Sequence, residues 1–311
     1  MSMGRYIGKR LLQLIPLLLV VTFAVYLLLD LAPGDPAVKK LNAQGTPASK
    51  DVVAQTREEM GLNRPFLVRY GSWLGHALCG DLGTSYQDDV PVTQKMLPCI
   101  GRTMVLSLVS LFAALLIAVP LGIVTAVKQD SVLDHIIRVL SFAGNAFPNF
   151  LLATLLMYGL CIKVHLFPII ASGSPAGLFL PALTLTIPLC GRLIRQFRAE
   201  TLQQLESPYV EGAVSRGVRP HTILWHDVLH NALPGMLTIT GHSVGILMGG
   251  SVVVEAMFGW PGLGKMAMDA ITARDYPVVQ AFVLFLTVLY VLLNLIVDIC
   301  YRALDPRVEL S

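Results

Sequence analysis

Several side chains in this sequence have types and spacings that occur in binding or catalytic sites. The run from Gly259 to Lys265 has the GxxxxGK spacing of a phosphate-binding loop. Such a loop needs a serine or threonine after the lysine to coordinate magnesium, and Met266 stands there instead. We therefore predict a turn at this place and no nucleotide site, so that any energy from ATP must come from another protein.

Histidines and cysteines give no clear metal or catalytic site. His226 and His230 have the i, i+4 spacing of zinc-binding helices, with His221 nearby, but no HExxH motif is present. The five cysteines form no CxxC or cysteine–histidine cluster. No serine, cysteine or carboxylate constellation suits catalysis. The sequence thus predicts solvated histidines, no enzyme, and no cofactor or metal site.

Polar residues within apolar stretches are stronger candidates. His242 lies inside one such stretch, and Asn145 and Asn149 flank Pro148 in another. An ionisable group at membrane depth is a candidate functional residue, while the alternative is a neutral imidazole bonded to a neighbouring helix. A helix broken by proline either lines a passage or is only kinked. We treat Asn145, Asn149 and His242 as candidate residues of a translocation path.

The elements that hold these residues are predicted to be membrane-spanning helices. Of the 311 residues, 54% are hydrophobic and 14% are charged, with a mean hydropathy of +0.66. A soluble domain carries about 25% charge, and a spanning helix needs about 20 apolar residues. The net charge of +3 gives no reason to expect a nucleic-acid partner. We predict an all-α membrane protein whose six transmembrane helices contain residues 11–29, 103–127, 139–162, 178–191 (continuing past Arg192), 233–254 and 278–297.

Basic residues in the short loops orient these spans. With the N-terminus in the cytoplasm, the inner segments hold twelve arginines and lysines and the short outer loops hold three. We therefore predict a cytoplasmic N-terminus at 1–10, an extracytoplasmic segment at 30–102, a five-helix core at 103–297 with a cytoplasmic region at 198–232, and a cytoplasmic tail at 298–311. The first span could instead be a signal peptide, but its apolar run is long and no A-x-A site follows it.

The outer segment 30–102 carries turn signals and one helix signal. Residues 51–60 are predicted to form a short helix that ends at Gly61, between turn clusters at 33–36 and 80–85. This segment is either a folded cap or a surface that docks a ligand-delivering protein. Cys79 and Cys99 both lie in it, and spacing alone does not establish the separation that a disulfide needs.

The cytoplasmic region has clearer helix boundaries. Ser207 and Pro208 are typical of a helix start, and Gly217 of a helix end. Val210, Ala213 and Val214 then form one apolar stripe, and a second short helix begins at Pro220. The alternative for this region is an interfacial helix resting on lipid head groups.

Here the residues resemble a known family, the membrane permease subunits of ABC importers. Their cytoplasmic motif reads Glu-Ala-Ala, three residues, then Gly, and Glu211, Gly212, Ala213 and Gly217 fit it, with Gly212 in place of an alanine. The dipeptide/oligopeptide/nickel branch is the most similar, although it has a basic Ala-Arg-Ala-Lys-Gly run at 212–217. The blocks that resemble this branch stand at 33–36, 61–65, 80–83, 231–234, 260–264, 274–278 and 304–307.

The resemblance implies a type I ABC importer permease fold in the inner membrane. It implies that Glu211, Gly212, Ala213 and Gly217 belong to a coupling helix that docks into an ATPase. The implied partners are two ATPase subunits, a second homologous permease subunit and an extracytoplasmic substrate-binding protein. The permease pair can be homodimeric or heterodimeric. The implied cargo is a peptide, nickel or a metal chelate, and the short outer loop after the third span favours the metal members. The alternative, an ion-gradient-driven secondary transporter, would need midplane carboxylates and internal repeats, which the sequence does not show.

Overall fold

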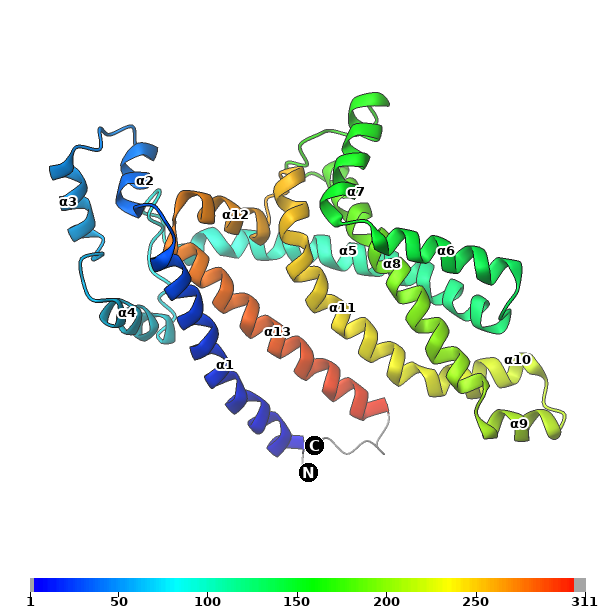
Figure 1. The fold of residues 1–311 in the computed structure, drawn as a ribbon. Helices are drawn as coiled ribbons and strands as arrows, with labels where there is room; N and C mark the ends of the chain where they lie inside the picture. Colours follow the sequence, from blue (N-terminus) through cyan, green and yellow to red (C-terminus); the bar gives the residue numbers. More distant parts are fainter. Residues whose placement is uncertain (1–2, 305–311) are drawn as a thin grey trace. The chain divides into compact units, whose positions relative to one another are not determined.

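Helices make up nearly all of the chain. The structure, a computed structural model, describes residues 3–304 (Figure 1). Among these residues the only β-type pairing is an isolated bridge between Thr84 and Pro91. The described chain divides into two compact units. Unit 1 contains the residues up to Tyr6, residues 104–260 and the residues from Leu292 onward; unit 2 contains residues 7–103 and 261–291.

Five helical segments among the described residues are long and apolar enough to cross a membrane, and a sixth is gained if one bent pair is counted as a span. These helices are α1 (Met3–Leu31), α5 (Val92–Val127), α8 (Pro175–Leu205), α11 (Leu229–Phe258, preceded without a break by α10 and η2) and α13 (Tyr276–Leu304). The all-helical fold with up to six spans that the sequence predicts is therefore confirmed.

The bent pair corresponds to the predicted span over 139–162, for which the sequence indicated a helix broken or kinked by proline. Helix α6 (Val132–Ala146) and helix α7 (Asn149–Leu156) meet at an angle of 97°, and α7 continues as a π-helical turn, η1 (Met157–Lys163). Pro148 has no N–H and its ring disfavours helical geometry in the residue before it, so Phe147 is extended at φ −79° and ψ 129°. The proline break noted in the sequence is thus a sharp bend.

Other helix ends also differ from the charge-bounded stretches. Helix α5 begins at Val92 rather than near Thr103, and α13 continues to Leu304 beyond the predicted end of its span. Helix α8 extends past Arg192 as expected, and it includes both Pro181 and Pro188. Charges limit the stretch that lipid can surround, but a helix can continue into water, so charge positions mark the span and not the helix.

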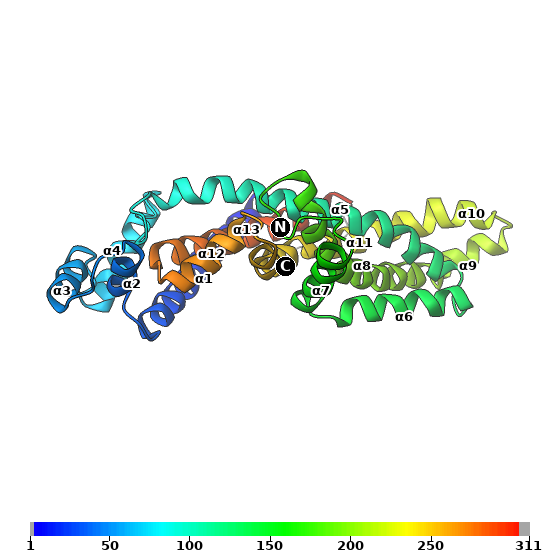
Figure 2. The same cartoon turned by 90° about the horizontal axis from the view of Figure 1, so that it is seen from above.

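Within unit 1, α8 is the central element. It packs against α6 and α11, and Figure 2 shows α6 and α8 running side by side. Small residues allow this approach: a Cβ placed on Gly191 of α8 would lie 2.3 Å from the carbonyl oxygen of Ser141 on α6. Glycines at helix contacts let backbones come close in membranes, where no hydrophobic effect drives helix pairing. The core of the unit is built largely from α8 residues such as Leu185, Leu193 and Phe197.

Unit 2 contains four short helices, of which the sequence predicted one. They are α2 (Pro36–Ala43), α3 (Lys50–Glu59), α4 (Phe66–Leu78) and α12 (Leu263–Ala273). The predicted helix at 51–60 corresponds to α3, and Gly61 follows it with a left-handed φ of +66°. The core joins α5, α12 and α13 through residues such as Val92, Leu263 and Val278.

Candidate functional site

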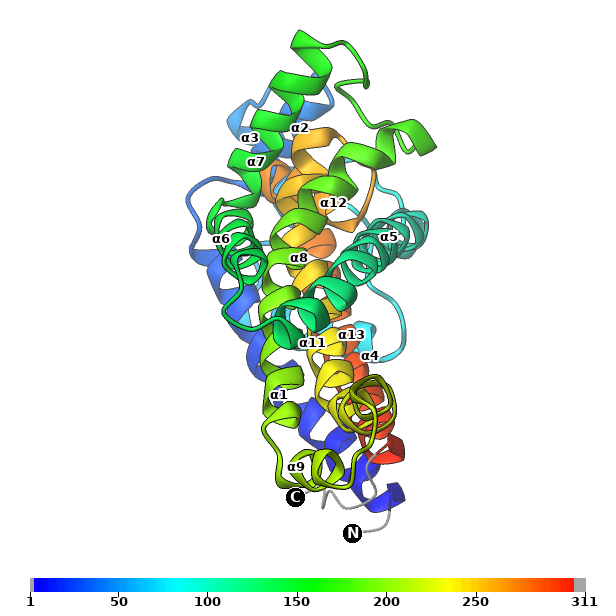
Figure 3. The ribbon, with the colours of Figure 1, turned by 90° about the vertical axis from the view of Figure 1, so that its right-hand side faces the viewer.

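The region 198–232, which the sequence predicts to be cytoplasmic, contains a short helix between two long ones. Helix α9 (Pro208–Ser215) follows α8, and Figure 3 shows it at the end of that helix. Gly217 has φ +77°, the left-handed conformation predicted for the helix stop. The N–H of Val218 then donates to the carbonyl oxygen of Ala213 at 3.1 Å, which closes the end of the helix.

The predicted cap at Ser207 does not form. Ser207 precedes the helix with extended geometry, but its Oγ donates to the carbonyl oxygen of Gln203, 3.0 Å away on α8, rather than accepting from the first turn of α9. A serine hydroxyl can turn back to the carbonyl four residues earlier, and here that local bond wins. Pro208 at the first position therefore carries the start signal by itself.

One face of α9 is covered by the chain itself. Val210 and Ala213 are buried and pack with Ile223 and Val228 in a small apolar cluster, which we call the α9 cluster. Val214, predicted to complete the stripe, is 60% exposed, so that part of the prediction is wrong. Because protein occupies the buried face of α9, this face is not available to lipid.

The opposite face of α9 is polar and open. Glu211 is exposed in the first turn, where the helix dipole favours a carboxylate. A Cβ on Gly212 would come within 3.4 Å of Nη1 of Arg216, so the two residues are neighbours. Tyr209 donates its hydroxyl hydrogen to Oε1 of Gln204 at 3.0 Å, and burial raises the pKa of this phenol. Glu211 is the one charged side chain in the first turn of α9, so it sets the charge at this end of the exposed face.

The second short helix predicted in this region is not a separate element. It begins at Pro220 as predicted, with α10 (Pro220–Thr222), but continues through a π-helical stretch, η2 (Ile223–Val228), directly into α11. The sequence predicted a separate short helix with solvated histidines at this place and contained no signal for the continuity with α11. Single π turns inside longer helices are frequent at functional sites. The α9 cluster thus attaches α9 to the first turns of a 39-residue helix.

A buried ion pair joins the same end of α8 to α6. Nε and Nη2 of Arg198 each donate to one carboxylate oxygen of Asp134, both at 2.9 Å. Asp134 is fully buried and Arg138 lies 3.5 Å from it on the same helix. Sequence reasoning missed this pair, because its members are 64 positions apart and each looked like an ordinary loop charge.

The three candidate path residues all lie in unit 1, and the structure brings one of them to another helix. Asn149 begins α7, and a Cβ on Gly250 of α11 would lie 3.6 Å from its Nδ2. His242 is exposed on α11, eight residues earlier in that helix, or about 12 Å along its axis. Asn145 lies in the last turn of α6, before the bend.

The other candidates behave as ordinary surface or turn residues. Gly259 ends α11 with φ +65°, and Lys265 on α12 pairs with Asp269 at 2.5 Å. His226 is exposed and bonds Asp227 at 3.2 Å. Over residues 3–304, no group of three histidines, cysteines or acids is arranged to hold a metal. Cys79 and Cys99, both described, are thiols without a disulfide between them.

The turn clusters of the outer segment come together in unit 2. Asp275 is 1% exposed and accepts hydrogen bonds from Oγ of Ser85 at 2.5 Å and from the N–H of Tyr86 at 2.9 Å. Arg274 donates to the carbonyl oxygen of Pro33. Three sequence blocks that are far apart, at 33–36, 80–86 and 274–278, therefore form one polar junction. The last block, at 304–307, lies outside the described residues after Leu304.

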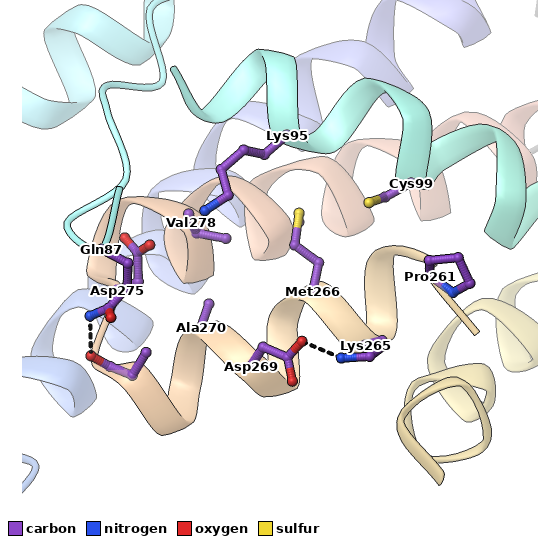
Figure 4. A pocket seen from close by; sticks show the side chains of 12 residues that line it. Gln87, Lys95, Cys99, Pro261, Lys265, Met266, Asp269, Ala270, Asp275 and Val278 are labelled. Carbon is purple, nitrogen blue, oxygen red and sulfur yellow. Dashed lines mark hydrogen bonds and ion pairs between the residues drawn. The ribbon is translucent and has the colours of Figure 1, made fainter. Parts of the chain in front are cut away.

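A cavity of about 290 Å³ opens beside this junction. Figure 4 shows Met266 and Asp269 of α12 with Lys95 and Cys99 of α5 around it. Its side chains combine two lysines with two carboxylates, so it has no excess charge for a polyanion. No group in it suggests catalysis.

Together the long apolar helices and the short helix between α8 and α11 describe a multi-pass membrane protein with one short, half-exposed helix outside its candidate spans. Comparison with known proteins identifies the class. Residues 118–310 match the family described as binding-protein-dependent transport system inner membrane component, and residues 3–124 match the N-terminal domain of the same kind of component. The chain belongs to this family of ABC importer permeases and is not itself an enzyme.

Two relatives match along nearly their whole length. The metal-staphylopine import system permease protein CntB of Staphylococcus aureus is 35% identical over 308 residues, covering 99% of both chains. The glutathione transport system permease protein GsiC of Pectobacterium atrosepticum is 37% identical over 307 residues, again covering 99% of both. The family also excludes the alternative of an ion-gradient-driven transporter.

Solved structures support the fold. The MetNI methionine ABC transporter, in an inward-facing conformation, matches with a TM-score of 0.54 and 18% identity, covering 68% of this chain and 97% of that one. At this identity the match concerns the fold alone. Family and fold together make the chain a multi-pass inner-membrane permease that works with a binding protein and an ATPase.

Proposed function

We propose that α9 is the coupling helix through which an ATPase drives this permease, with Glu211, Gly212, Ala213 and Gly217 at the contact. The observation that supports this most is the two-sided character of α9. Its apolar face is buried in the α9 cluster, while Glu211 and the end at Gly217 are exposed. A helix fixed from behind with a charged open face suits docking to a protein partner better than resting on lipid.

In this proposal, movement of α9 reaches the membrane helices by two routes. The α9 cluster carries it to η2 and α11, because Val210 packs with Ile223 and Val228. The Asp134–Arg198 pair carries it from α8 to α6. ATP binding would then favour one of two conformations of the permease, and transport energy comes from this difference and not from tight substrate binding.

We further propose that the working complex contains two ATPase subunits and a second homologous permease. One copy of the chain leaves many large apolar side chains exposed, among them Phe112, Leu116 and Phe150. Lipid and a second permease subunit would cover them. Asn145, Asn149 and His242 are proposed to line the path at the interface between the two permeases, where polar groups at membrane depth find a role.

The proposed substrate is a small peptide or a metal chelate delivered by the binding protein. The two relatives named above are called permeases for metal-staphylopine and for glutathione, which is itself a small peptide. Their identities differ by only two percentage points, so they do not favour one class. These names do not support the sequence-based preference for nickel. The name of the metal-staphylopine permease does support a metal chelate as a candidate substrate. Ligand identification on the cognate binding protein would decide between the classes.

Both termini are proposed to be cytoplasmic, on the strength of the basic residues in the short loops. Reporter domains fused after Lys128 and after Ser311 should then both give cytoplasmic signals. A periplasmic signal from either fusion would contradict this orientation.

The coupling role is tested in the complete complex reconstituted in liposomes. Glu211→Lys should reduce co-purification of the ATPase and substrate-stimulated ATP hydrolysis, because it reverses the charge of the docking face. Gly217→Val should uncouple hydrolysis from uptake, since a β-branched residue disfavours the left-handed conformation by about 1–2 kcal/mol.

Two matched variants separate coupling from misfolding. Gly217→Asn should retain most coupling, because asparagine tolerates the left-handed conformation. Glu58→Lys makes the same charge reversal on α3 in unit 2 and should leave ATPase co-purification unchanged. If Glu211→Lys and Gly217→Val both transported at the wild-type rate, α9 would not be the coupling helix.

A further inference from the structure

A second cavity in unit 2 has a different chemical character from the one beside α12. It has a volume of about 310 Å³ and lies between α1, α4, the 81–86 loop and the start of α13. Its lining is aromatic and polar: Tyr26, Arg64, Arg69, Trp73, His76 and Tyr86 all contribute. Nothing in the coupling or transport role described above uses it.

Two hydrogen-bond donors on side chains of this lining have no partner among residues 3–304. They are Nε of Arg69 and Nε1 of Trp73, and both are buried atoms. The rest of the Arg69 guanidinium is held in place, because Nη2 donates to the carboxylate of Asp30. Buried donors are nearly always satisfied in folded proteins, so two unpaired donors on side chains that both line one cavity indicate a missing acceptor, which a small shift of these side chains would admit.

The charges around the cavity favour a single negative charge on that acceptor. Arg64 and Arg69 line it, and Asp81 is the one carboxylate of the lining, with an oxygen that accepts from the N–H of Gly83 at 2.9 Å. Asp30 neutralises part of Arg69 from outside the lining. Burial raises the pKa of Tyr86, which therefore remains a neutral phenol. An arginine and an indole N–H side by side suit an oxyanion and repel a cation.

The position of α4 indicates where this oxyanion comes from. Helix α4 lies along the second half of α1: Tyr70 donates to the carbonyl oxygen of Leu19 at 3.3 Å, and its ring packs edge-on to Phe23 at 5.3 Å. Trp73 lies 6.3 Å from the ring of Tyr26. Since α1 is a candidate span, α4 is placed at the depth of its outer half.

Large apolar side chains on both helices are exposed around this place. They are Leu27, Leu28 and Leu31 on α1 and Leu67, Val68 and Leu78 on α4. Tyrosine and tryptophan gather where a membrane meets water, beside the phosphate groups of its lipids. A soluble anion would have no need of these apolar surroundings, whereas acyl chains would cover them.

We propose that this cavity binds the phosphodiester group of a phospholipid, with Arg69 and Trp73 donating their unpaired N–H groups and Arg64 supplying charge at the mouth. The acyl chains then lie against the exposed leucines of α1 and α4. The bound lipid would fix α4 on α1 and so hold the outer segment at a set depth. This inference is independent of the coupling role of α9.

The test is lipid retention by the assembled complex, measured by native mass spectrometry with added phosphatidylglycerol. Trp73→Phe keeps an aromatic side chain but replaces the indole by a phenyl ring and so removes its N–H. The apparent affinity should therefore fall by about tenfold, as for loss of one hydrogen bond to a charged acceptor. Tyr70→Phe, on the same helix but outside the cavity lining, should leave retention unchanged. Arg64→Gln provides a second variant at an exposed site and should weaken retention several-fold.

Three outcomes would overturn the proposal. The first is wild-type retention by both Trp73→Phe and Arg64→Gln. The second is equal retention of diacylglycerol, which has no phosphate and would show an apolar groove only. The third is equally tight binding of glycerol 3-phosphate, which would make the site one for a soluble oxyanion and not for a lipid.

Discussion

Different kinds of contact stabilise the interior of each of the two units of this permease. In unit 1, helices meet through close backbone approach, as at Gly191 and Ser141, and through one buried bidentate ion pair. In unit 2, short helices are joined by capped turns and by ion pairs that are partly exposed, such as Arg57 with Asp35 at 2.6 Å. Inside a membrane, close packing is favourable and an unpaired charge costs free energy, whereas the short helices α2, α3 and α4 of unit 2, which belong to none of the candidate spans, can satisfy their polar groups with water.

This difference explains what the sequence could predict. Turn chemistry is local, so Gly61 and Gly217 gave correct helix ends, and Pro148 gave the break before α7. The uncharged stretches predicted the membrane spans, because a lipid bilayer can surround only segments without charged side chains.

Contacts between distant residues could not be predicted in the same way. Nothing near Asp134 in sequence points to Arg198, and Ser207 looked like a cap although its hydroxyl bonds Gln203 on α8. Helix α4 was not predicted, because in segment 30–102 only residues 51–60, followed by Gly61, were interpreted as a helix with a glycine typical of a helix end. Of the candidate site, the bounds of α9 were predicted closely, but the exposure of Val214, one of the three residues of its apolar stripe, was not.

Among substitutions that compare the two units, the largest loss of stability should come from replacing Asp134 in unit 1. Replacing it by asparagine removes the charge that pairs with Arg198 in a buried place, which costs about 3–5 kcal/mol. We expect little assembled complex and a strongly lowered midpoint of thermal unfolding, measured by fluorescence-detected size exclusion. Asp269→Asn in unit 2 is the matched control, because its pair with Lys265 is exposed and contributes at most about 1 kcal/mol.

Equal midpoints for these two variants would contradict the contrast between a buried and an exposed pair. Arg198→Met added to Asp134→Asn should recover part of the loss, since removing both partners leaves no unpaired buried charge.

A smaller effect is expected from Gly191→Ala. The added methyl group would overlap the backbone of Ser141 on α6, and overpacking of this kind costs about 1–3 kcal/mol. Gly101→Ala on α5 in unit 2 meets no atom within 4 Å and should be neutral or slightly stabilising. Thermal unfolding of the two purified complexes checks this, and a Gly191→Ala variant as stable as Gly101→Ala would mean that α6 and α8 are not in close contact.

The smallest of the three effects belongs to unit 2. Asp35 caps α2 by accepting from the N–H of Ala37 at 2.9 Å, and Asp35→Ala should cost about 1 kcal/mol. Asp51→Ala, at an exposed site in the first turn of α3, should lower the free energy of unfolding by only a few tenths of the roughly 1 kcal/mol expected for Asp35→Ala. Limited proteolysis of the outer segment is the suitable measurement. Faster cleavage in the Asp51 variant than in the Asp35 variant would reverse the expected order.

The central claim is that the open face of α9 meets the ATPase. A photo-crosslinking amino acid at Val214, which is 60% exposed on α9, tests it in the assembled complex. The matched control is Val132, which is 76% exposed at the start of α6. It is predicted to lie on the same side of the membrane as Val214. Our account predicts crosslinks from position 214 to the ATPase and few from position 132. Crosslinks from position 214 to lipid alone would contradict it.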